Sequence, residues 1–164
     1  MNTQAFFVRS DDRTGVVRLI AQRLLAPTDP PGKQPDWGLE RSYDIWLAQE
    51  LKRKVAVSPV HDHWIAGVES KEVLDFVMLQ EIATQLNVEV VACQLASTID
   101  SWGYARCVDG RLAESEWREN DPDPFNSLRG YLRGNLISHD IIGFREAVGL
   151  CDRGWTLVQH KAAH

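Results

Sequence analysis

Cysteine is scarce in this sequence and does not occur in pairs. Cys93, Cys107 and Cys151 are an odd, widely spaced set without a C-x-x-C spacing. A disulfide framework normally uses an even number of cysteines, and a zinc ribbon uses closely spaced pairs of them. The sequence therefore gives little support to either. We expect buried free thiols at Cys93 and Cys107, and we leave open whether Cys151, in a predicted loop, is reactive.

Long apolar runs are also missing. No stretch approaches the roughly 20 apolar residues that a helix needs to cross a bilayer. The first four residues, Met1 to Gln4, lack the basic leader and apolar segment of a signal peptide. We therefore expect a cytoplasmic protein that does not bind membranes.

Positive charge is in short supply. The formal net charge is −5, whereas binding to phosphate backbones requires clustered Lys and Arg. We therefore expect no nucleic-acid partner. The densest basic cluster, Lys52-Arg53-Lys54, is short enough to be explained as a solvated strand edge.

Motifs that hold cofactors are absent from the sequence. It contains no P-loop, G-x-G-x-x-G, H-E-x-x-H or EF-hand pattern, and no G-x-S-x-G elbow around a nucleophilic serine. We therefore predict no cofactor.

A strand–serine–helix unit occurs twice. An apolar run at residues 5–10 ends at a serine and is followed by helical periodicity over 11–25, and residues 65–70 and 71–86 repeat the arrangement. We interpret each serine as a helix cap, and the acidic residues near the second helix as favourable charges for the helix dipole. Further strands are predicted at 54–58, 64–69 and 88–95.

This order, β-α-β-β-α-β, predicts a ferredoxin-like α+β fold. Its four strands would form one antiparallel sheet with both helices on one face. The 164 residues suffice for a single domain. We expect a core over 4–95, a hairpin over 102–117 and a helical extension over 123–160.

The predicted hairpin is centred on Asp109-Gly110, a dipeptide that favours a tight type I′ turn. Regular pairing from that turn would place Tyr104 opposite Ser115 and Trp102 opposite Trp117. The hairpin would either extend the sheet or cover an open edge. Otherwise an edge strand could pair across a two-fold axis and form a homodimer.

The extension begins with a strong helix start. Asp123 suits the N-cap and Pro124 the first helical position. A second helix is predicted at 140–148 and a last strand at 155–159.

An insertion separates the first helix from the second strand. Four prolines between residues 27 and 35 predict an irregular surface loop, and residues 39–52 fit a helix better than the alternative strand. Aromatic residues on a loop either clamp it to the body or contact a partner. The candidate partner-binding residues are Trp37, Glu40, Tyr43, Asp44 and Trp46.

A cluster of two histidines and an aspartate is the alternative candidate site. His61, Asp62 and His63 offer metal-ligand types, but their spacing fits a turn better than a metal site. With Asp100 they would form a site only if the loops after neighbouring strands meet.

Two classes of function remain. The first is a non-enzymatic domain that binds an unidentified protein, for example a bacterial accessory, inhibitor or immunity-type protein. The alternative is a small-molecule-binding protein or a metal-assisted hydrolase around His61, His63 and Asp100.

Overall fold

A computed structural model describes residues 1–25, 34–39 and 52–159. The elements in these ranges, in chain order, are β1 (Asn2–Arg9), α1 (Arg13–Leu25), β2 (Lys54–Val57), β3 (Trp64–Glu69), α3 (Phe76–Gln85), β4 (Val90–Ala96), the 3-10 helix η1 (Ser97–Ile99), β5 (Ser101–Val108), β6 (Arg111–Arg118), α4 (Pro124–Gly134), α5 (Phe144–Val148), the 3-10 helix η2 (Cys151–Arg153) and β7 (Thr156–Gln159).

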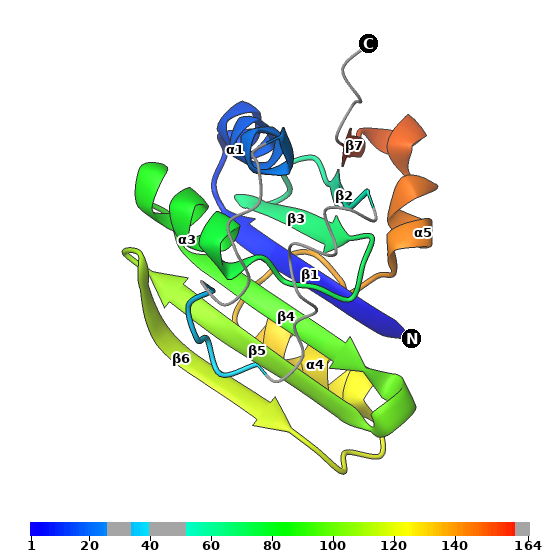
Figure 1. The fold of residues 1–164 in the computed structure, drawn as a ribbon. Helices are drawn as coiled ribbons and strands as arrows, with labels where there is room; N and C mark the ends of the chain where they lie inside the picture. Colours follow the sequence, from blue (N-terminus) through cyan, green and yellow to red (C-terminus); the bar gives the residue numbers. More distant parts are fainter. Residues whose placement is uncertain (26–33, 40–51, 160–164) are drawn as a thin grey trace.

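The described strands form one antiparallel sheet of seven, in the order β6-β5-β4-β1-β3-β2-β7 (Figure 1). The expected α+β class is confirmed, and the sheet is larger than the four strands expected for the core. The hairpin β5–β6 extends the sheet beyond β4, and the last strand β7 pairs with β2 at the other side. Strands from both ends of the chain therefore share one sheet.

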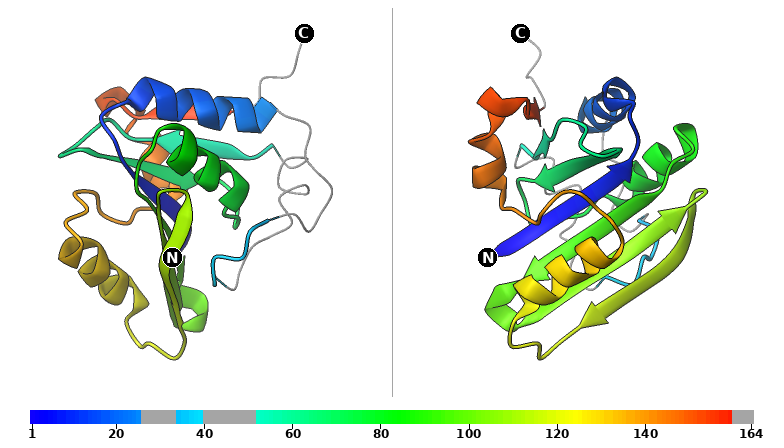
Figure 2. Two further views of the ribbon diagram at one scale, coloured as in Figure 1. Left: turned by 90° about the vertical axis from the view of Figure 1, so that its left-hand side faces the viewer. Right: turned by 180° about the vertical axis from the view of Figure 1, so that it is seen from behind.

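Helices cover both faces of this sheet (Figure 2). Helices α1 and α3 pack on one face. Helices α4 and α5 pack on the opposite face and bury a second apolar cluster. The C-terminal extension thus covers the face of the central strands that is opposite α1 and α3.

The central strands are apolar on both sides because both faces are covered. Along β1, Phe6 and Val8 face α1 and α3, whereas Ala5 and Phe7 face α4 and α5. All of β4 is buried, which confirms the expectation of a central strand there.

The second helix begins later than the periodicity predicts. It starts at Phe76 rather than near residue 71, because the buried Asp75 caps it by accepting a hydrogen bond from the Met78 amide. Ser70 is not a helix cap: its hydroxyl accepts from the Lys54 amide and ties the loop to β2. Ser10 also does not cap its helix directly, since Asp12 accepts from the Gly15 amide.

The hairpin has the expected turn but a different register. Asp109 and Gly110 both have positive φ, and Val108 pairs with Arg111. A β-bulge then shifts the pairing between Arg106 and Cys107.

The shift changes every later pair of the hairpin. Tyr104 lies opposite Glu116 rather than Ser115, and Trp102 lies opposite Arg118 rather than Trp117. The extra residue, Ala113, is left unpaired, as β-bulges require.

The C-terminal segment follows the expectation in part. Asp123 caps α4 with Pro124 in its first turn, which confirms the predicted helix start. The second helix is shorter than expected and begins only at Phe144, with Gly143 at the N-cap. Strand β7 confirms the predicted last strand.

Nearly all of the segment 39–52 lies outside the described residues, so the choice between helix and strand there stays a prediction. Within the described ranges, no helix is long and apolar enough to cross a membrane.

We predict that Gly67→Ala destabilises the protein. Gly67 lies opposite Phe6 in the sheet, and a Cβ there would overlap the Phe6 ring. Overpacking of this kind costs about 1–3 kcal/mol, measurable by urea unfolding.

Gly130→Ala is the matched control. Nothing lies within 4 Å of a Cβ at this helical position, so the change should stabilise the protein by about 0.5–1 kcal/mol. Equal effects of the two substitutions would contradict the packing shown at Gly67.

Candidate functional site

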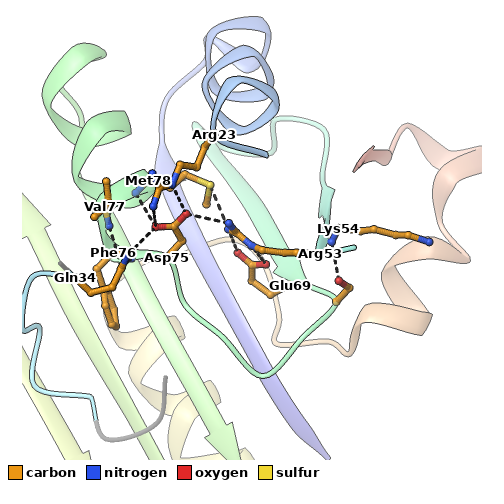
Figure 3. A network of polar contacts seen from close by, with 10 residues as sticks. Arg23, Gln34, Arg53, Lys54, Glu69, Asp75, Phe76, Val77 and Met78 are labelled. Carbon is orange, nitrogen blue, oxygen red and sulfur yellow. Dashed lines mark hydrogen bonds and ion pairs between the residues drawn. The ribbon is translucent and has the colours of Figure 1, made fainter. Parts of the chain in front are cut away.

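The most unusual site in the described residues is a buried ion-pair network of Arg23, Arg53, Glu69 and Asp75 (Figure 3). Arg23 comes from the last turn of α1, and Arg53 directly precedes β2. Glu69 ends β3, and Asp75 caps α3. Four separate elements thus meet at these charges.

Arg53 is the centre of the network, with a side chain that is fully buried. Its Nε donates to Glu69 Oε2 at 2.8 Å, and Nη2 donates to Glu69 Oε1. Its Nη1 donates to Asp75 Oδ2 at 2.9 Å. One guanidinium therefore grips two carboxylates, using the fork geometry that lysine lacks.

Asp75 collects donors from several directions. Arg23 Nε donates to Asp75 Oδ2 at 2.7 Å, and the Met78 amide donates to Oδ1 at 3.2 Å. Gln34 also donates to this carboxylate through Nε2, at 3.4 Å. The Gln34 side-chain oxygen accepts from the Phe76 amide at 2.8 Å, so Gln34 joins the segment 34–39 to the start of α3.

The two carboxyl groups respond differently to their surroundings. Burial alone would raise the pKa of Asp75, but the charge of Arg53 and the hydrogen bond and charge of Arg23 outweigh it and hold this pKa below its usual value. At Glu69, burial raises the pKa above its usual value against the opposing effect of Arg53.

The network is suited to holding the fold together rather than to catalysis. Two guanidinium groups balance two carboxylates, and each carboxylate is already paired. Side-chain exposure is 0% for Arg53, Glu69 and Asp75, so no described group among them is open to a substrate. The network instead holds four separate elements of the fold together at one point.

This network was not predicted from the sequence, and the prediction for Arg53 was wrong. The cluster Lys52-Arg53-Lys54 was expected to be solvated, yet Arg53 is only 1% exposed. Period-two alternation along β2 contains the signal, because Arg53 shares a face with Val55 and Val57, and both belong to the core. Glu69 and Asp75 are ion-pair partners, not merely favourable charges near a helix start.

Of the predicted partner-binding residues, only Trp37 lies in the described part of the chain. Trp37 is 3% exposed and packs against Phe76 with ring centroids 5.1 Å apart. Its indole therefore acts as a clamp and is not free to contact a partner. Glu40, Tyr43, Asp44 and Trp46 lie outside the described residues.

The residues of the alternative site lie far apart. His61, Asp62 and His63 form the exposed turn before β3, where Asp62 and His63 have positive φ. Asp100 ends η1 in a left-handed conformation. The turn lies beside the end of β1 and Asp100 beside its start, roughly 24 Å away along the strand.

The structure therefore does not bring the two histidines together with Asp100. Among the residues described, no group of three or more His, Cys, Asp or Glu side chains is arranged to hold a metal ion.

Ser58 and His139 form a pair that sequence reasoning did not find. Ser58 Oγ lies 3.4 Å from His139 Nε2. That nitrogen donates its proton to the Trp64 carbonyl at 2.8 Å, and Ser58 Oγ donates to the Pro59 carbonyl. Because Nε2 carries a proton, it cannot act as the base for Ser58.

Two of the three cysteines are buried, as expected. Cys93 and Cys107 lie in β4 and β5, and burial raises the pKa of both thiols. Low thiolate content makes such groups inert. Cys151 is exposed in η2.

Comparisons with known proteins add no functional information. No family model matches the chain, and no significant match is found among curated proteins or solved structures.

We predict that Asp75→Asn strongly destabilises the protein. The change keeps the size and the capping oxygen but removes the charge that balances Arg23 and Arg53. Breaking a buried ion pair from one side costs about 3–5 kcal/mol, measurable by chemical denaturation.

Asp123→Asn is the matched control, because Asp123 also caps a helix by accepting from the amide three residues later. Asn caps as well as Asp, so this variant should unfold with a nearly unchanged midpoint. Similar losses in both variants would show that capping, not ion pairing, is what matters at Asp75.

The stability that Asp75 contributes should depend on pH. Its folded pKa is lowered, so the contribution is present above its unfolded pKa of about 3.9 and is lost as pH falls through the folded pKa. The difference in unfolding free energy between wild type and Asp75→Asn should shrink as pH falls below about 4. A difference that grows below that pH would contradict the lowered pKa.

Proposed function

We propose that the protein is a non-enzymatic interaction domain that binds a protein partner along the outer edge of β6. One observation carries this proposal. Strand β6 is eight residues long, and within the described residues it pairs only with β5. A strand in this position presents unpaired backbone N–H and C=O groups, to which an extended segment can add.

The exposure of β6 supports the proposal. Residues Arg111 to Ser115 are all exposed, and they include a large apolar side chain, Leu112, which is 40% exposed. The helices of the two faces pack over inner strands, so β6 projects beyond them (Figure 2).

The strand is also held firmly from behind. Tyr104 of β5 stacks on Tyr131 of α4 with ring centroids 3.7 Å apart. The Tyr104 hydroxyl donates to Glu116 and the Tyr131 hydroxyl to Glu114, each at 3.3 Å. A pre-ordered strand loses little conformational freedom when a partner binds.

We further propose that the core is ferredoxin-like. The four strands β4-β1-β3-β2 are neighbours in this order, and α1 and α3 lie on the same face. The hairpin β5–β6, strand β7 and the helices α4 and α5 would then be additions to that core. The edge of β6 would then belong to an addition that is specific to this protein and not to the ferredoxin-like core.

The insertion remains part of the proposal at Glu40, Tyr43, Asp44 and Trp46, with Trp37 as its anchor. We propose a cytoplasmic accessory or inhibitor-type role, without a nucleic-acid or membrane partner, in keeping with the net charge of −5.

A photo-crosslinking residue at Ala113 tests the proposed edge. Ala113 is the exposed, unpaired bulge residue of β6, so the probe should not disturb pairing with β5. In extracts of the native cell we expect a discrete covalent adduct, detected by gel mobility and mass spectrometry. Excess unlabelled wild-type protein should suppress it.

The same probe at Arg18 serves as control, because Arg18 is exposed on α1, which packs toward β2 and β7 at the side of the sheet opposite β6. Identical adducts at the two positions, or no adduct at Ala113, would refute binding at the β6 edge.

A further inference from the structure

Strand β6 carries both a negative and a positive side chain on one face, so two copies of the strand can offer each other opposite charges. Glu116 and Arg118 share the face of the sheet that α4 covers further in, and Arg118 Nε donates to Glu116 Oε1 at 2.7 Å. This hydrogen bond keeps the pKa of Glu116 below its usual value, so the carboxylate is ionised at neutral pH. Trp117, half-buried, lies between them on the opposite face, beside Gly103.

Strand geometry restricts how two copies of β6 could pair. Alternate residues of an edge strand direct their backbone groups outward. An antiparallel pair related by a two-fold axis must therefore be centred on a residue, not between two. The bulge at Ala113 leaves residues 114–118 as the regular part of the strand, so the axis must pass through one of these five.

Charge separates the five possible registers. Centring on Glu114 or Glu116 places that carboxylate opposite its own copy, and centring on Arg118 does the same with guanidinium groups. Centring on Ser115 places Glu114 opposite Glu116 twice. Centring on Glu116 also places Glu114 opposite Arg118, but it keeps two like-charged Glu116 side chains opposite each other at the axis. Only centring on Trp117 places unlike charges opposite each other and no like charges opposite each other, because Glu116 then faces Arg118 of the second copy, and the reverse.

We propose that the partner at the β6 edge is a second copy of this chain, paired antiparallel about a two-fold axis through Trp117. This inference rests on the proposed use of the β6 edge and names its occupant. The two Trp117 side chains would form a cross-strand aromatic pair, flanked by two Glu116–Arg118 pairs between the copies. Cross-strand aromatic pairs and opposite charges both stabilise antiparallel strands.

The ends of the strand limit the length of this pairing. The bulge at Ala113 interrupts the ladder on one side, and Asn120, with a φ of 57°, turns the chain away on the other. So short a ladder buries less surface than a permanent interface. The dimer therefore forms and dissociates with protein concentration.

Charge reversal on the full-length chain tests this register. Sedimentation velocity over a wide concentration range should show wild type moving from one to two chain masses. Arg118→Glu and Glu116→Arg each place like charges opposite one another, and each should weaken dimerisation on the order of tenfold or more. Arg111→Glu changes the same strand outside the pairing and should dimerise as wild type does.

The sharpest result comes from combining the two variants. A one-to-one mixture of Arg118→Glu and Glu116→Arg should form a heterodimer, because each variant supplies the charge the other lacks. The chain carrying both changes should also dimerise as wild type does.

Three outcomes would overturn the inference. They are a wild type that stays monomeric, a dimer unaffected by either single variant, and a mixture that stays monomeric. The two proposals fail separately. If the Ala113 probe crosslinks only a different protein, β6 is still an interaction edge and only the second copy is wrong, whereas no adduct at Ala113 refutes the edge itself.

Discussion

The grip of Arg53 on two carboxylates is the interaction on which the arrangement of this protein depends. It joins the end of β3 to the start of α3, and Asp75 extends the connection to α1 through Arg23. Four buried charges are costly unless each is paired and hydrogen-bonded. The elements therefore have little freedom to shift, because a small displacement would leave a charge unmatched inside the core.

This constraint also explains why the two ends of the insertion are held so closely. Arg23 precedes the first undescribed stretch, Gln34 lies between the two stretches, and Arg53 follows the second. All three side chains reach Asp75. Trp37 adds an apolar contact with Phe76 at the helix that Asp75 caps. The segment 34–39 is thus attached by polar and apolar contacts to one helix start.

The sequence was sufficient where local chemistry decides structure. The apolar run of β4, the Asp109-Gly110 turn and the Asp123-Pro124 helix start all follow from short-range preferences. It failed where distant residues decide. Arg53 was judged by its basic neighbours, whereas its environment comes from Glu69 on the adjacent strand β3 and Asp75 at the start of α3. We expected a smaller sheet because the pairing of β7 with β2 joins residues about a hundred positions apart, which local preferences do not reveal.

The bulge at Ala113 determines which side chains of β6 lie on each face of the hairpin. Side chains alternate between faces, so one extra residue reverses the assignment of everything that follows. Without it, Ser115 and Trp117 would stand beside Tyr104 and Trp102, and the charged residues would move to the face of Gly103. The single extra residue Ala113 therefore decides whether aromatic or charged side chains of β6 lie beside Tyr104 and Trp102.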